Sequence, residues 1–169
     1  DDGLLPNDLW ALVPSGRGFG MLGQMLTASE VKQFYETIFA LKAEGLEIVS
    51  GDPVAAQMSE AAPVEGGDIA AGSCAAGVAA LTLLPDGTVT PCRRLNISLG
   101  KVPRDSLREI WAVSPVLEAL RERSRYQGKC AACLRWDRCR GCRAIAYAAS
   151  QARGRPDFLA SDPQCFIES

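Results

Sequence analysis

The sequence contains no histidine among its 169 residues, and this absence excludes several kinds of site at once. Without imidazole there is no Ser–His or Cys–His nucleophile pair, no histidine general base and no histidine ligand for zinc. Long apolar runs are also missing, since none approaches the roughly 18–20 residues that a membrane-spanning helix needs. We therefore expect neither a histidine-based hydrolase nor a membrane protein.

A recognisable N-terminal start is also missing. Asp1-Asp2-Gly3 has no initiator methionine, and no basic and apolar segments of a secretory signal follow it. We expect a chain that begins within a longer, cytoplasmic protein. Its 47% apolar and 22% charged residues are typical of a soluble globular protein, and its length allows one domain or one and a half.

The charge is distributed unevenly along the chain. Residues 93–143 hold 13 of the 18 basic residues but five of the 20 acidic ones, and five of the seven cysteines lie between Cys92 and Cys142. Metal-bound thiolates are anionic, so a basic surrounding suits a metal cluster held by cysteines. A solvated basic face is the alternative. Nucleic acid is a weaker interpretation, because aromatic residues do not alternate with the basic ones.

The first 69 residues predict a strand, a helix and a second strand. Apolar residues 9–13 form a candidate strand, residues 14–18 a loop, and residues 46–49 the second strand. Between them, Thr27 and Glu30 have the spacing of a capping box, and Gly45 ends the helix. This order is typical of part of an α/β layer, with a domain boundary expected near residue 70.

The second part predicts a small α+β domain. Strands at 80–84 and 88–90 flank Pro85-Asp86-Gly87, which has the composition of a hairpin turn. Helices are expected after Asp105-Ser106, after Ser114-Pro115, and from about residue 142 to 153, where Gly154 follows.

The spacing of the seven cysteines is the main chemical signal. Cys74 and Cys92 come first, then Cys130-x2-Cys133-x5-Cys139-x2-Cys142, and finally Cys165. Disulfides are disfavoured, because the number is odd and nothing marks secretion, and a redox Cys-x2-Cys pair lacks thioredoxin-like flanks. One alternative is a non-catalytic, partner-docking module with structural zinc on Cys130, Cys133, Cys139 and Cys165. An iron–sulfur cluster fits better, because its separate corner irons suit a tight loop plus a distant residue.

Several segments carry a resemblance to a known family. They are Leu84–Cys92, Ser98–Val102, Ser106–Trp111, Gly128–Cys133, Cys139–Ala144 and Asp162–Cys165. Together, over about residues 74–166, they resemble the SPASM domain, the auxiliary-cluster module at the C-terminus of many radical S-adenosylmethionine enzymes. Residues 9–53 resemble more weakly the last strand–helix–strand of the partial TIM barrel of such enzymes. The family usually has three residues between the fifth and sixth cysteines. This sequence departs from that pattern, because only Arg140 and Gly141 lie between Cys139 and Cys142.

The resemblance implies two auxiliary iron–sulfur clusters of the [4Fe–4S] type. Cys130, Cys133, Cys139 and Cys165 would hold the outer cluster, and Cys74, Cys92 and Cys142 the inner one. Residues 75–80, where the family often has another cysteine, contain no ligand type, so the inner cluster would have an open iron or be a smaller cluster. A basic shell would offset the cluster charge: Arg93, Arg94, Lys129, Arg135, Arg138, Arg140 and Arg143. We expect Tyr126, Trp136, Tyr147 and Trp111 to serve core packing.

The implied function is radical modification of a peptide, with a tetrapyrrole as the second choice of substrate. The clusters would transfer electrons or anchor the substrate, and a flavodoxin or ferredoxin would supply electrons. The three-cysteine loop that holds the S-adenosylmethionine-cleaving [4Fe–4S] cluster is absent from this sequence. We therefore expect this chain alone to be inactive, and S-adenosylmethionine and the third cluster to belong to the full-length enzyme.

Overall fold

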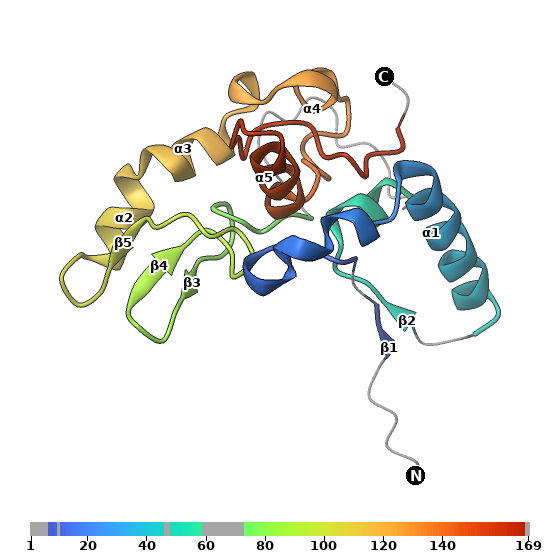
Figure 1. Ribbon diagram of the computed structural model, residues 1–169, viewed down its shortest axis with the longest axis horizontal. Coiled ribbons are helices and arrows are strands. Elements are labelled where there is room, and N and C mark those ends of the chain that lie inside the picture. Colours follow the sequence, from blue (N-terminus) through green and yellow to red (C-terminus); the bar gives the residue numbers. More distant parts are fainter. Residues whose placement is uncertain (1–6, 10, 46–47, 59–72, 168–169) are drawn as a thin grey trace, which may run out of the picture.

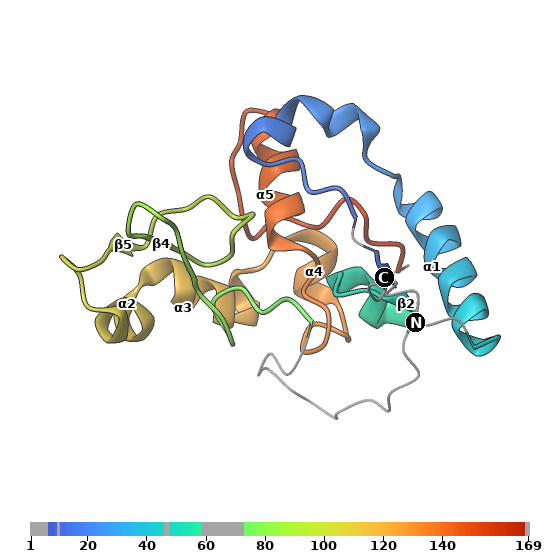
Figure 2. The same cartoon turned by 90° about the horizontal axis from the view of Figure 1, so that it is seen from below.

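The structure is a computed structural model, and it describes residues 7–9, 11–45, 48–58 and 73–167. The elements form two groups with helix α5 (Arg143–Ala152) between them, as both views show (Figures 1 and 2). One group contains the N-terminal elements, and the other contains a three-stranded antiparallel sheet. In the described part of the chain, no helix is long and apolar enough to cross a membrane.

The N-terminal group is a strand–helix–strand unit with two added 3-10 helices. Its elements are β1 (Asn7–Asp8), η1 (Gly16–Gln24), α1 (Ala28–Ala43), β2 (Ile48–Val49) and η2 (Pro53–Met58). Strands β1 and β2 pair in parallel, which the crossover through α1 makes possible. The predicted capping box between Thr27 and Glu30 is confirmed, and Gly45 follows the helix with φ of +96°.

Two predictions for this group are wrong. The first strand lies at residues 7–8, and the described residues of the apolar run 9–13 are not in a strand. The N–H of Ala11 donates to the Asp52 carboxylate at 2.5 Å, so a side chain takes the place of a strand partner. Residues 16–18 of the predicted loop belong to η1. Trp10, Leu46, Glu47 and the predicted boundary near residue 70 lie outside the described residues.

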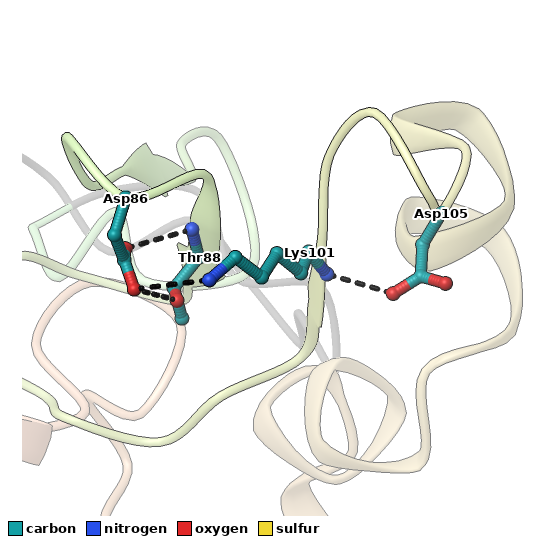
Figure 3. A network of polar contacts seen from close by, with 4 residues as sticks. All are labelled: Asp86, Thr88, Lys101 and Asp105. Atoms are coloured by element: carbon teal, nitrogen blue, oxygen red, sulfur yellow. Dashed lines mark hydrogen bonds and ion pairs between the residues drawn. The ribbon is translucent and has the colours of Figure 1, made fainter.

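The predicted hairpin is confirmed, and a third strand extends it. Strands β3 (Thr82–Leu83), β4 (Thr88–Thr90) and β5 (Gly100–Lys101) pair antiparallel in that order. At the turn, the Asp86 carboxylate accepts the Thr88 N–H at 3.0 Å and lies 3.4 Å from the Lys101 ammonium (Figure 3). Gly87 has φ of +86°, and a Cβ there would collide with the Val102 carbonyl, so the turn requires glycine.

Short helices joined by short connections follow the sheet along the chain. They are α2 (Leu107–Val113), α3 (Pro115–Arg121), η3 (Arg123–Arg125), α4 (Gly128–Ala132) and α5. The predicted starts of α2 and α3 are confirmed: the Ser106 hydroxyl accepts the Glu109 N–H, and Pro115 is the first residue of α3. Gly154, with φ of +74°, follows the end of α5 as predicted.

Three small cores stabilise the fold. One joins the sheet to α2 and α3 through Val89, Ile110, Leu117 and Leu120. The others centre on Val31, Tyr35, Val54 and Ala55 and on Tyr126, Cys130 and Trp136. The tail after α5 packs Phe166 against the N-terminal core, and the Gln164 side-chain amide donates to the Leu26 carbonyl at 3.2 Å. The tail therefore links the cysteine-rich part to the N-terminal group.

Candidate metal centre

Four thiols surround one small cavity. Cys130 lies in α4, Cys133 follows that helix, Cys139 lies in the next loop, and Cys165 lies in the tail. All four line one small pocket, which Lys129, Trp136, Arg140 and Gly141 complete. These are the four residues that the resemblance assigns to the outer cluster, so the fold brings the distant Cys165 to the local trio.

The thiols are not arranged around a single ion. Among the described residues, which include all seven cysteines, no three Cys, Asp or Glu side chains are close enough to share one metal ion. None of the seven cysteines forms a disulfide. A cubic cluster is held by thiolates that bind different irons and surround the cube, so separated sulfurs around a cavity suit it.

Three cysteine sulfurs accept a backbone N–H from the residue two positions later. The pairs are Arg94 with Cys92, Arg135 with Cys133, and Gly141 with Cys139, at N–S distances of 3.5, 3.4 and 3.4 Å. Hydrogen bonds to sulfur stabilise thiolate charge and help to set the potential of a cluster. The same local turn therefore prepares members of both predicted sets for ligation.

The link between Cys139 and Cys142 is a tight left-handed turn. Arg140 and Gly141 both have positive φ, +53° and +62°. A Cβ on Gly141 would lie 2.6 Å from the Asp162 Cβ and 2.7 Å from the Arg143 Nη2. The turn explains how two residues are enough to lead from the cavity to the start of α5.

Arg143 lies between the two predicted cysteine sets. Its side chain is fully buried, and its Nη2 is 3.6 Å from the Cys130 sulfur. Its Nη1 donates to the carbonyls of Phe158 and Ala160 at 3.1 and 2.7 Å. Burial opposes the charge, but nearby negative groups, Cys130 foremost and Cys74 among them, outweigh it and raise the pKa of Arg143. One guanidinium therefore acts electrostatically on both sets.

The inner set is drawn from separate elements. Cys74 is buried, and its carbonyl accepts a hydrogen bond from the Arg140 guanidinium. Cys142 is the N-cap of α5, and its N–H donates to Asp162 at 2.6 Å. Cys92 lies just beyond β4 and is partly exposed. The approach of Cys92 to Cys74 and Cys142 stays a prediction, as does the open iron of the inner cluster.

Burial changes the pKa of the Cys142 thiol more than the N-terminus of α5 does. Desolvation, together with the charges of Asp162 and Cys74, raises the pKa of the Cys142 thiol to about 12. The N–H groups of Ile145 and Ala144 at the start of α5 act in the opposite direction, as expected at a helix N-terminus. The start of the helix therefore favours the thiolate, but burial outweighs this effect.

Buried hydrogen-bond donors around the cavity indicate whether an anionic group would fit there. Among the described residues, five buried N–H-bearing atoms have no partner; one is Arg121 Nη2, and the other four belong to residues near the cysteines: Trp136 Nε1, Arg140 Nε and Nη1, and Arg143 Nε. A buried donor without an acceptor costs about 1–3 kcal/mol. Trp136 and Arg140 also line the cavity. A thiolate-held iron–sulfur cluster carries negative charge, so these residues fit it.

The predicted basic shell divides into buried and exposed members. Arg140 and Arg143 are buried beside cysteines, whereas Lys129 and Arg135 are exposed. Arg93 is also exposed, Arg94 is partly buried, and Arg138 lies 3.8 Å from the buried Asp137.

The aromatic residues mainly serve packing, as predicted. The Tyr126 and Trp136 rings meet edge to face at 5.3 Å in a buried core. Trp111 is partly buried, and the Arg121 guanidinium lies 4.4 Å from its ring. Tyr147 is partly buried as well.

Sequence reasoning assigned no role to Asp162 and Gln164, although both are buried. The Asp162 carboxylate accepts the N–H groups of Cys142 and Gln164 at 2.6 and 2.8 Å, and burial raises its pKa. Asp162 thereby fastens the tail that carries Cys165 to the start of α5. The signal available in the sequence was an acidic residue before Pro163, a combination typical of a turn.

The relatives that this chain matches are named as heme synthases and as a peptide cyclase. It is 30% identical to "AdoMet-dependent heme synthase" of Nitratidesulfovibrio vulgaris, over 93% of this chain and 45% of that relative. The protein of the same name from Oleidesulfovibrio alaskensis is 28% identical, over 93% of this chain and 42% of the relative. "PqqA peptide cyclase" of Ruegeria pomeroyi is 34% identical, over 53% of this chain and 24% of the relative.

The chain spans less than half the length of these relatives. Residues 74–143 match the family model of SPASM, described as an iron–sulfur cluster-binding domain. The matched segment contains every cysteine except Cys165. The resemblance stated from the sequence is therefore confirmed over these residues.

Proposed function

Because residues 74–143 form a SPASM domain, we propose that the chain is the auxiliary-cluster part of a radical S-adenosylmethionine enzyme and binds two [4Fe–4S] clusters. The observation that carries the proposal is the cavity shared by Cys130, Cys133, Cys139 and Cys165. These four thiols would hold the outer cluster. Cys74, Cys92 and Cys142 would hold the inner cluster and leave one iron for another ligand.

The clusters would supply one-electron transfer, and an open inner iron would also be able to bind substrate. The residues of the chain would prepare their environment. Arg140 and Arg143 offset negative charge from buried positions, where a guanidinium acts strongly. Trp136 closes one wall of the outer cavity and excludes water from it.

For the substrate of the full-length enzyme, the comparisons favour a tetrapyrrole over a peptide. Two relatives named heme synthase align with 93% of the chain and a third, 38% identical, with 47%, whereas the relative named peptide cyclase aligns with 53%. A peptide, preferred from the sequence alone, is the second candidate, and the 34% identity to the peptide cyclase supports it. Titrating the full-length enzyme with an iron porphyrin tests this choice. A shift of the porphyrin's Soret band is expected, and no shift would favour the peptide.

Cluster binding is tested by iron and sulfide analysis after anaerobic reconstitution. Cys130→Ser and Cys165→Ser should each lower the iron content by about four per chain relative to the unchanged protein, since each variant loses one [4Fe–4S] cluster. Sulfide should fall by the same number. The remaining cluster should keep its absorbance near 400 nm.

Circular dichroism provides the control for folding of the two variants. If both variants fold and retain all the iron, these cysteines are not ligands and the proposal fails. One zinc per chain without colour in the unchanged protein would establish the zinc-binding alternative instead.

A further inference from the structure

A surface groove lies directly against the outer cysteine cavity. The groove has a volume of about 360 Å³, and Cys133 and Cys165 are part of its lining. The same two cysteines line the cavity on their other side. They therefore form the wall between the candidate cluster site and the protein surface.

The groove combines apolar and basic side chains. Leu134 and Ile167 supply apolar surface, and Lys129 and Arg135 supply positive charge. Leu134 is 94% exposed, more than the other exposed large apolar residues of the described chain, such as Val113 at 69% and Leu83 at 56%. A single exposed leucine is ordinary, but an apolar residue beside a cysteine wall and between two cations is the composition of a docking patch.

The charge around the groove selects the kind of partner. Among the described residues that line it, two are cationic and none is anionic. The wider segment 123–143 contains seven basic residues, of which Arg140 and Arg143 are buried, and one acidic residue, the buried Asp137. The other five cations attract and orient an acidic protein and speed its association.

We propose that this groove is the docking site of an acidic electron-carrier protein, an inference that rests on the proposed outer cluster. Docking there places the carrier's redox group against the Cys133–Cys165 wall. One electron passes from the reduced carrier to the oxidised cluster, so that the carrier is oxidised and the cluster reduced by one electron each. No bond forms or breaks, and no proton is transferred.

The test uses the reconstituted full-length enzyme and stopped-flow absorbance near 400 nm, with reduced flavodoxin as the probe and dithionite as a small reductant. Leu134→Glu should slow reduction by flavodoxin at least tenfold, because it adds a negative charge to the patch. Reduction by dithionite, a small anion that does not need to dock in the groove, should slow far less. Leu83→Glu on strand β3 is the matched control, and both of its rates should equal those of the unchanged enzyme.

The assignment of the outer cluster and the docking site can each be contradicted by a different result. If the absorbance change caused by dithionite in Cys165→Ser equals that of the unchanged enzyme, Cys165 holds no outer cluster and the docking proposal falls with the cluster assignment. If the change is smaller in Cys165→Ser and flavodoxin reduces Leu134→Glu at the unchanged rate, the cluster stands and the docking site is wrong. If Leu134→Glu instead separates an oligomer in gel filtration, a second copy occupies the groove, which also overturns the proposal.

Discussion

The two predicted cysteine sets are organised differently. The outer set has three members within ten residues, Cys130, Cys133 and Cys139, and one member in the tail, and all four line one cavity. Cys74, Cys92 and Cys142 of the inner set lie before the sheet, beyond β4 and at the start of α5. Short spacing brings the outer trio together locally, whereas the inner set depends on the packing of distant elements.

The two sets are nevertheless joined by one short segment. Arg140 donates to the Cys74 carbonyl from the inner set, and it also lines the outer cavity. Arg143 approaches the Cys130 sulfur and lies within electrostatic reach of Cys74. The comparison therefore predicts that changes in residues 140–143 affect both sets, whereas changes elsewhere affect one set or neither.

The largest effect is expected from Gly141→Ala. An alanine with φ of +62° costs about 1–2 kcal/mol, and its Cβ would also collide with Asp162 and Arg143, so we expect a loss of about 3 kcal/mol or more in the free energy of unfolding. Thermal unfolding measures this loss. Iron analysis should show that both clusters are depleted.

The matched control for this variant is Gly154→Ala. Gly154 has a similar φ, +74°, but a Cβ there would meet nothing within 4 Å. Gly154→Ala should therefore cost only the backbone term of about 1–2 kcal/mol and keep both clusters. Equal destabilisation by the two variants would mean that the collision with Asp162 and Arg143 is not felt in solution.

The next largest effect separates the two sets. Cys92→Ser should remove the inner cluster, about four irons per chain, and leave the outer cluster intact, because Cys92 does not line the outer cavity. Mössbauer spectra before and after the change should lose one component and retain the other. Retention of all the iron in a folded variant would remove Cys92 from the ligand set and leave the inner cluster without its hairpin ligand.

Local patterns in the sequence predicted the local features of the fold. The capping box at Thr27, the hairpin turn at Gly87 and the start of α3 at Pro115 each depend on a few neighbouring residues, and each is confirmed. The strand predicted at residues 9–13 is wrong, because apolar composition indicates burial but does not identify a hydrogen-bond partner. The partner of Ala11 is a carboxylate 41 residues away.

In the candidate site, too, the sequence predicted local features but not the contacts between distant residues. Spacing and family resemblance named the four thiols of the cavity, but not the contacts that hold them. Asp162 fastens the tail to the start of α5, and Arg143 donates to the carbonyls of Phe158 and Ala160 in the same tail. Such contacts join residues that are 15–20 positions apart and require the folded chain, because a buried arginine looks like any basic residue in a sequence.

A smaller effect is expected from Arg143→Gln, which should keep both clusters but change both, the outer one more than the inner one. Removing a positive charge near Cys130 makes the reduced, more negative state less favourable, so the midpoint potential of the outer cluster should fall. The variant also leaves the carbonyls of Phe158 and Ala160 without their donor, at a cost of about 2–4 kcal/mol. A redox titration followed by electron paramagnetic resonance measures the potential.

Two further variants separate charge from packing at this position. Arg143→Lys retains the charge but not the planar fork, so the potential should recover more than the stability does. Arg125→Gln removes an exposed arginine that pairs with Glu118 and Glu122, and it should leave the potential unchanged. A potential that is the same in all three variants would show that Arg143 serves packing alone.

The smallest effect concerns the sheet group, where the Asp105 carboxylate accepts the Lys101 N–H at 2.7 Å (Figure 3). A side-chain hydrogen bond from Arg104 and the Lys101 N–H lower the pKa of Asp105 from 3.8 to about 2. A folded-state pKa below the unfolded value adds stability above about pH 4, and this stability is lost as the pH falls towards 2. Asp105→Asn should flatten that acid dependence without changing the iron content at neutral pH, because these contacts lie between α2 and β5. Titration of the carboxyl carbon by nuclear magnetic resonance checks the value, and a midpoint near 4 would mean that the contacts with Arg104 and Lys101 do not persist in solution.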